Sequence, residues 1–258
     1  MAEGCVYLVG AGPGDPELLT VKALRVIREA DVVVMDRLVS HDIEALIPAG
    51  TTRIFAGKEA GKHHLRQEEI NDLLQRLAQS GRRVVRLKGG DPLVFGRGSE
   101  EAEHLARSGI RFEVVPGITA AAGCTAYAGI PLTHRGLANT VRFITGHAMD
   151  NGDIEYDWPK LVDPDCTLVI YMGLGTLDRL ATALIGAGMP PDMPAAAIQH
   201  GTTAHQRRVT AALAELPQVV RSARLASPTL VVIGKVVGMA ETLDWFQPMP
   251  ADTQSVAL

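Results

Sequence analysis

Hydrophobic and polar positions alternate along the first half of the chain in a way that predicts strands and helices in turn. Helical spacing is clearest at 67–79, where isoleucine and leucine recur at i, i+3, i+4 and i+7 starting from Ile70, and Gly81 follows as a stop signal. Short aliphatic runs, typical of buried strands, occur at 5–9, 32–35, 84–87 and 112–115. Strands that alternate with helices predict an α/β domain with a mainly parallel sheet.

The alternation resumes after a polar stretch without clear period at 146–165. Strands are predicted at 141–145, 167–171, 195–198, 207–210 and 229–234, and helices near 176–186 and 211–221. We therefore expect two α/β domains. Their predicted bounds are 1–116 and 136–246, with a connecting segment at 117–135 and a tail at 247–258.

Composition narrows the class of protein. The net charge of −4 and the sequence pI of about 6.1 argue against general nucleic-acid binding, which usually needs an excess of Lys and Arg. Three widely spaced cysteines indicate neither a disulfide framework nor a zinc cluster, and a reducing cytoplasm fits. We see no membrane span and no secretory signal.

The stretch 84–98 carries the strongest indication of a ligand site. A predicted strand stops at Gly89-Gly90-Asp91-Pro92 and continues into Phe95-Gly96-Arg97-Gly98 before a helix. Adjacent glycines let the backbone approach a ligand, and open α/β sheets bind ligands at this edge. The alternative is an ordinary turn that needs flexible residues.

Two other glycine-rich loops invite phosphate-binding interpretations that fit poorly. The loop 10–15 has Asp15 where a dinucleotide fingerprint needs its third glycine, and Pro13 removes an amide. The loop 57–63 is one residue short for a P-loop and has His63 where Ser or Thr would bind magnesium.

Three segments together resemble the S-adenosylmethionine-dependent tetrapyrrole methylases. They are VGAGPGDPELLTVKA at 9–23, VVRLKGGDPLVFGRG at 84–98 and PGITAAAGCTAYAGIPLTHRG at 116–136. The resemblance runs from about 6 to 246, and the FGRG and THRG endings are most similar to the members that methylate uroporphyrinogen III. Leu93 stands where relatives often have phenylalanine, which affects only local packing.

The resemblance implies the tetrapyrrole methylase fold: two α/β domains with a cofactor cleft between them, in a homodimer. It implies methylation of uroporphyrinogen III at two pyrrole carbons, C2 and C7, giving precorrin-2 via precorrin-1. S-adenosyl-L-methionine would be the donor, S-adenosyl-L-homocysteine the product, and the pathway served would be sirohaem, cobalamin or haem d1 synthesis. The expected partner is a small-molecule tetrapyrrole, with no metal.

The resemblance also assigns residues. Asp36 and Lys58 match the proton acceptor and donor, and Arg97 is a third catalytic candidate. Substrate-facing positions match Arg97, Glu100, Arg135 and Met172. Cofactor contacts match Pro13, Gly89, Gly90, Asp91, Val94, Thr119, Ala120, Met172, Gly201 and Ala226.

Several of these residues have independent support and an ordinary alternative. Asp36 directly follows a strand, where a catalytic carboxylate would face a cleft, but turns also favour aspartate. Arg97 lies between two glycines that no packing demand explains, and its fork suits a carboxylate; otherwise it is a surface arginine. Met172 could be core filler. A cationic cleft is predicted because only Asp91 is a local acid near Arg82, Arg83, Arg86, Lys88 and Arg97.

Rival functions remain open at this point. A tetrapyrrole methylase that acts later in cobalamin synthesis is the nearest. Diphthine synthase and the ribosomal-RNA 2′-O-methyltransferase share the architecture, but we expect them to lack the FGRG and THRG arginines. A nucleotide-binding regulatory module that uses the loop 10–15 belongs to a different class.

Overall fold

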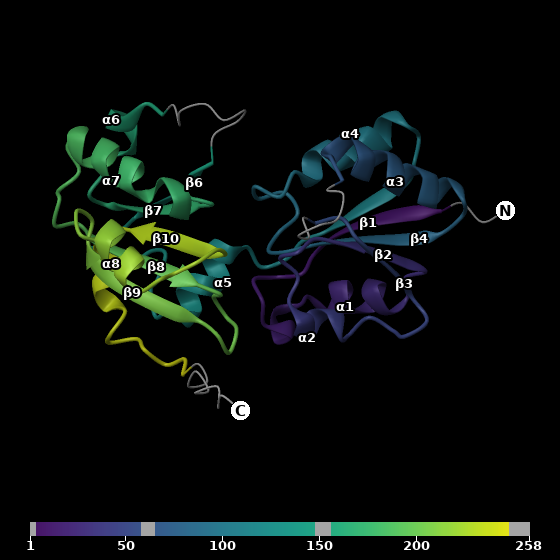
Figure 1. The fold of residues 1–258 in the computed structure, drawn as a ribbon, viewed down its shortest axis with the longest axis horizontal. Helices are drawn as coiled ribbons and strands as arrows, with labels where there is room; N and C mark the ends of the chain where they lie inside the picture. Colours follow the sequence, from purple (N-terminus) through teal and green to yellow (C-terminus); the bar gives the residue numbers. More distant parts are fainter. Residues whose placement is uncertain (1–3, 58–64, 148–155, 248–258) are drawn as a thin grey trace, which may run out of the picture. The chain divides into compact units, whose positions relative to one another are not determined.

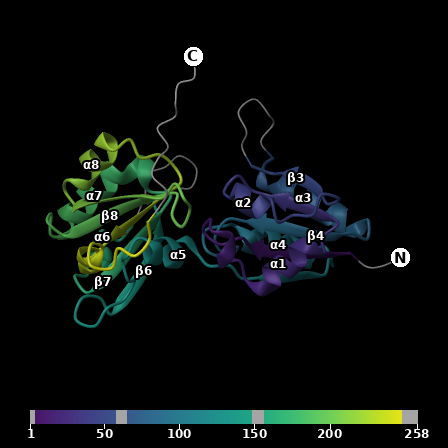
Figure 2. The same ribbon diagram turned by 90° about the horizontal axis from the view of Figure 1, so that it is seen from below.

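A computed structural model describes residues 4–57, 65–147 and 156–247 and divides into two compact units (Figure 1). The first unit is Met1–Ala120 and the second is Ala121–Leu258. Each unit contains one five-stranded sheet with helices (Figures 1 and 2). The predicted α/β class is therefore confirmed. None of the described helices is both long and apolar enough to cross a membrane.

All strand pairs in the sheet of the first unit are parallel. In the order β3-β2-β4-β1-β5, the strands are Thr52–Phe55, Val32–Met35, Arg83–Lys88, Cys5–Gly10 and Phe112–Val115. Since all five run the same way, the turns that follow them lie along one edge.

Helices cover both faces of this sheet (Figure 1). On one face, α1 (Val21–Arg28) and α2 (His41–Glu44) bury their apolar sides; on the other, α3 (Gln67–Gln79) and α4 (Gly98–Arg107) do so. Alternate strand residues therefore meet different helices. The two buried faces explain why the central strands read as continuous aliphatic runs.

The second unit has a mixed sheet of order β6-β7-β10-β8-β9. In that order the strands are Thr140–Thr145, Cys166–Tyr171, Thr229–Ile233, Pro194–Gln199 and Arg207–Ala212. Only β6 and β7 pair in parallel, whereas β10 is antiparallel to both of its neighbours. The carboxyl ends of β7 and β8 and the amino end of β10 consequently share one edge.

The helices of the second unit are α5 (Ala120–Tyr127), α6 (Trp158–Leu161), α7 (Leu177–Gly186) and α8 (Leu216–Ser222). The helix predicted from residue 211 begins five residues later, because β9 continues through Ala212. No helix was expected where α5 lies.

Candidate functional site

The carboxyl edge of the first sheet gathers residues that the sequence assigned to ligand binding. Pro13 follows β1, Asp36 follows β2, Gly89 follows β4, and Thr119 follows β5. These residues are up to about a hundred positions apart in the chain. The parallel strand order brings their turns to the same edge.

Glycine backbones pack directly against one another at this edge. The Gly12 N–H donates to the Gly90 carbonyl at 3.1 Å, and the Gly90 N–H donates to the Gly12 carbonyl at 2.7 Å. A Cβ on Gly10 or on Gly117 would lie less than 3.0 Å from the Gly90 carbonyl oxygen. Glycine is therefore required where the turns after β1, β4 and β5 meet.

Gly90 differs from the other two because its missing side chain leaves space. Its φ of +69° is in the left-handed region, and the nearest atoms to a Cβ there would be the Ala120 nitrogen at 3.6 Å and the Thr119 Cα at 3.9 Å. All three residues are expected cofactor contacts. A Cβ would fill a cradle of backbone atoms, and such a cradle fits a ligand that lies against main chain.

Asp91 connects two of these turns. Its Oδ1 accepts the Leu93 N–H at 2.8 Å and its Oδ2 accepts the Gly117 N–H at 3.1 Å. Val94 is half-buried in the same turn, where its N–H donates to the Asp91 carbonyl at 3.4 Å. The carboxylate thus has a structural role in addition to the expected cofactor contact.

The glycines on either side of Arg97 do have a packing reason, contrary to the sequence interpretation. A Cβ on Gly96 or on Gly98 would lie less than 3.0 Å from the Pro92 carbonyl oxygen, which accepts the Gly98 N–H at 2.9 Å. Arg97 itself caps α4 with a left-handed φ of 59°. The tight turn therefore fixes where this arginine leaves the helix.

Arg97 and Glu100, both predicted to face substrate, form a bidentate pair. Arg97 Nε lies 2.8 Å from Glu100 Oε1, and Nη2 lies 2.7 Å from Oε2. The hydrogen bond between them lowers the pKa of Glu100 and raises the pKa of Arg97. The pair is about half exposed, so a substrate carboxylate would compete with Glu100 for the fork.

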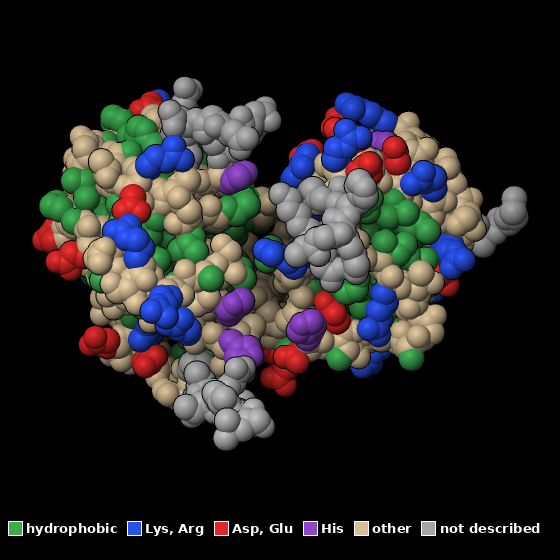
Figure 3. All heavy atoms as spheres, in the orientation of Figure 1, with side chains coloured by type: hydrophobic (Ala, Val, Ile, Leu, Met, Phe, Trp, Pro, Cys, Tyr) green, Lys and Arg blue, Asp and Glu red, His purple; other side chains and the backbone are tan. Residues whose placement is uncertain are grey.

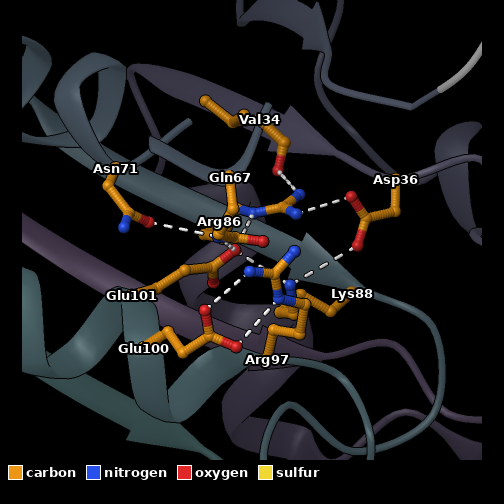
Figure 4. A network of polar contacts seen from close by, with 9 residues as sticks. All are labelled: Val34, Asp36, Gln67, Asn71, Arg86, Lys88, Arg97, Glu100 and Glu101. Atoms are coloured by element: carbon orange, nitrogen blue, oxygen red, sulfur yellow. Dashed lines mark hydrogen bonds and ion pairs between the residues drawn. The ribbon is translucent and has the colours of Figure 1, made fainter. Parts of the chain in front are cut away.

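Asp36 is held by two cations from β4 (Figure 4). Its Oδ1 accepts from Arg86 Nη2 at 2.5 Å, and its Oδ2 lies 3.5 Å from Lys88 Nζ. The strand period explains the meeting, because Val34 on β2 pairs with Arg86 and the next same-face positions are 36 and 88. Both carboxylate oxygens are therefore oriented by the adjacent strand.

Glu101, on α4, completes this cluster. Its Oε1 accepts from Arg86 Nε at 3.0 Å, from Lys88 Nζ at 3.0 Å and from Gln67 Nε2 at 3.2 Å. Burial opposes the charge of Arg86, but Asp36 and Glu101 outweigh it and raise the pKa of Arg86. The sequence analysis assigned no role to Glu101.

The predicted cationic cleft is corrected by these pairs. Arg83 meets Glu29 at 2.5 Å, Arg86 and Lys88 meet Asp36 and Glu101, and Arg97 meets Glu100. The acids come from segments remote in sequence, so local counting missed them. Figure 3 shows basic and acidic side chains interspersed over the visible face of each unit.

The second unit places its expected site residues along one sheet edge. Met172 follows β7, Gly201 lies just beyond β8, and Ala226 precedes β10, where its carbonyl accepts from Thr229 Oγ1 at 2.7 Å. Met172 is 53% exposed, so it is not core filler.

Strained backbone marks the same edge. Met172, His200 and Thr202 have φ values of 53°, 47° and 68°. Non-glycine residues in this region are uncommon, and such strain gathers at functional sites. Partial burial, with a smaller effect from His205, lowers the pKa of His200 and favours its neutral form.

Three further expectations have separate outcomes. A Cβ on Gly201 would lie less than 3.0 Å from Cys124 Sγ, so this glycine also has a packing reason. Arg135 is exposed in a turn of the second unit, closed by the bridge between His134 and Ala138. Lys58 lies outside the described residues. Within the described ranges, no group of three or more His, Cys, Asp or Glu side chains could hold a metal.

Comparisons with known proteins agree on one family. The sequence model of the tetrapyrrole (corrin/porphyrin) methylases matches residues 5–217. A siroheme synthase of Nitrosospira multiformis is 56% identical over 246 residues, which are 95% of this chain and 52% of that protein. An Arabidopsis thaliana protein named S-adenosyl-L-methionine-dependent uroporphyrinogen III methyltransferase, chloroplastic, is 55% identical over 238 residues, 92% of this chain and 64% of that protein.

A solved structure is also similar. Uroporphyrin-III C-methyl transferase from Thermus thermophilus, complexed with S-adenyl homocysteine, superposes with a TM-score of 0.77 at 43% identity, covering 90% of this chain and 98% of the other. The chain spans about half the length of the siroheme synthases it matches.

Proposed function

Because the chain belongs to the tetrapyrrole (corrin/porphyrin) methylase family, we propose that it transfers methyl groups from S-adenosylmethionine to uroporphyrinogen III. Two transfers, at C2 and C7, would give precorrin-1 and then precorrin-2, which feeds sirohaem, cobalamin or haem d1 synthesis. The observation that carries the proposal is the position of Asp36, a cation-held carboxylate on the same sheet edge as the Gly90 cradle. A homodimer in the cytoplasm is part of the same proposal.

The cofactor supplies a methyl group that its sulfonium already activates. The chain therefore has to hold the substrate carbon in line at about 3 to 3.5 Å, exclude water and remove one proton. Asp36 is the proposed proton acceptor, because both of its oxygens are oriented and it is 29% exposed. Lys58 is the proposed donor.

The remaining roles follow the two sheet edges. Proposed cofactor contacts from the first unit are Pro13, Gly89, Gly90, Asp91, Val94, Thr119 and Ala120, and those from the second unit are Met172, Gly201 and Ala226. Arg97, Glu100, Arg135 and Met172 are proposed to contact substrate. The Arg97 fork suits a substrate carboxylate because it already binds one bidentately in Glu100.

A binding competition separates this function from a nucleotide-binding regulatory module. S-adenosylhomocysteine should bind to the purified chain, and neither NAD nor ATP should displace it. The turn 10–15 supports this expectation, because Asp15 caps the following helix through the Glu17 N–H at 2.8 Å and an acidic side chain disfavours phosphate.

The decisive experiment is an anaerobic time course with uroporphyrinogen III and S-adenosylmethionine, followed by mass spectrometry. A singly methylated product should appear before the doubly methylated one, because each transfer leaves S-adenosylhomocysteine that must depart first. Cofactor binding without any methylated tetrapyrrole would refute the substrate and leave the family membership intact.

A further inference from the structure

Two cations and two carboxylates form a charge-balanced cluster on the face of the first sheet that α3 and α4 cover (Figure 4). The exposed fractions of the side chains are 2% for Arg86, 4% for Lys88 and 0% for Glu101, against 29% for Asp36. Asp36 is thus the member of the cluster that solvent or a ligand can reach. The other three lie behind it.

Glu101 connects the two buried cations from the side opposite Asp36. One oxygen, Oε1, accepts from both Arg86 and Lys88, while Oε2 is buried without a hydrogen-bond partner among the described residues. A glutamine could accept the same hydrogen bonds through its own Oε1. The contribution that only glutamate makes is therefore the negative charge, retained despite the cost of an unpaired buried oxygen.

We propose that Glu101 is a positioning residue for Asp36: it fixes Arg86 and Lys88 and offsets part of their charge, so that Asp36 stays ionised and still basic enough to accept a proton. This inference rests on the proposed function. Without Glu101, the two cations would have Asp36 as their only partner in the cluster. With it, each cation is shared between two carboxylates.

The direction of the pH effect follows from the charges around Asp36. The groups in contact with it are Arg86 and Lys88 from β4, with Glu101 behind them on α4. Arg97 and Glu100 neutralise each other, and Gln67 of α3 is uncharged. Removing a negative neighbour favours the ionised carboxylate, whereas removing a positive neighbour disfavours it.

Two variants should move the acidic limb of the pH–rate profile in opposite directions. Glu101→Gln should shift the limb to lower pH by about half a unit or more and slow methylation at the plateau on the order of tenfold, because Asp36 becomes a weaker base. Lys88→Met, which removes a cation, should shift the limb to higher pH. Single-turnover rates from pH 5 to 9 give both readouts.

Controls separate positioning from folding. Glu101→Asp keeps the charge and should leave the limb within about a quarter of a unit of the parent, even if its plateau rate falls. Glu103→Gln makes the same change two residues along α4, in a pair with Arg107 that is 59% exposed at the glutamate, and should behave as the parent. Thermal melts verify that each variant is folded.

The outcomes distinguish this inference from the function on which it rests. A parent chain that does not methylate uroporphyrinogen III contradicts the proposed function. An active parent whose limb stays fixed in both variants, or moves the same way in both, overturns the role of Glu101 alone. If Glu101→Gln fails to fold, Lys88→Met and Glu101→Asp still decide the matter, because only the former should move the limb.

Discussion

At Gly90 the structure excludes a side chain for two separable reasons. The φ of +69° strains any branched residue, and a Cβ would project into the cradle beside Ala120 and Thr119. Gly90→Val should therefore lose measurable binding of S-adenosylhomocysteine by calorimetry. The effect should exceed the loss expected from backbone strain, which costs about 1–3 kcal/mol.

Gly109 provides the matched control. It has the same φ of +69°, but nothing lies within 4 Å of its Cβ position, and it is exposed beyond the end of α4. Gly109→Val should lower the melting temperature in a similar way and still bind S-adenosylhomocysteine. Equal affinities in the two variants would exclude the Gly90 cradle from the cofactor site.

Asp36→Asn tests the proposed base. The amide cannot accept the proton, so methylation in single turnover should slow by about 10²–10⁴-fold, while affinity for S-adenosylhomocysteine stays near that of the parent. The residual rate should also lose its acidic limb. An unchanged rate would make Asp36 a structural partner of Arg86 and Lys88 only.

Sequence reasoning could identify Asp36 but not the residues that hold it. Asp36 follows a strand directly, whereas the contact of Glu101 with Arg86 depends on how α4 packs over β4. One signal was present: Arg86 and Lys88 share a strand face with the buried Val84, and a charge at such a position needs a partner. Spacing alone could not say which acid that partner is.

At the scale of elements, strong periodicity predicted the structure best. The helix at 67–79 and the strands at 32–35 and 112–115 have the predicted bounds. The helix α5 was missed because its sequence, rich in Ala and Gly, has no apolar stripe. Hydrophobic patterns also cannot give strand direction, so the antiparallel pairs of the second sheet were not predicted.

The contact of α5 with the turn after β8 can be tested through Gly201. Gly201→Ala should destabilise the chain by about 1–3 kcal/mol in urea unfolding, because its methyl group would overlap Cys124. Adding Cys124→Ala removes the sulfur and should make the double variant more stable than additivity predicts.

Gly186 serves as the comparison for that substitution. It lies in the last turn of α7 with nothing within 4 Å of its Cβ position, so Gly186→Ala should stabilise the chain by about 0.5–1 kcal/mol. A Gly201→Ala variant as stable as the parent would mean that the turn moves freely away from α5.

For the whole molecule, each unit buries an aliphatic core of its own. The first has one apolar cluster on each face of its sheet, and the second has a cluster between its sheet and α7 and α8. The sequence predicted two α/β domains from the resumed alternation. Its finer boundaries, at 116 and 136, stay predictions.

The three cysteines report on these cores. Cys5 lies in the first unit, whereas Cys124 and Cys166 lie in the second, and all three are buried. Burial raises the pKa of Cys124 to about 12, so its reactive thiolate is scarce at neutral pH. The folded chain should therefore resist an aromatic disulfide reagent, and raising the pH from 7 to 9 should not accelerate labelling as it would for an exposed thiol.

The same pKa fixes how alkali affects stability. The folded-state pKa of Cys124 lies above the unfolded value of about 8.5, so its stabilising contribution is complete below that pH and is lost as pH rises from there towards 12. In a urea series at pH 7.5, peptide mapping should find Cys124 and Cys166 labelled together. Cys5 should be labelled at its own midpoint, because a separate core protects it. Rapid labelling of Cys124 without urea would contradict its burial, and labelling of Cys124 well before Cys166 would show that α5 opens apart from the sheet it packs on.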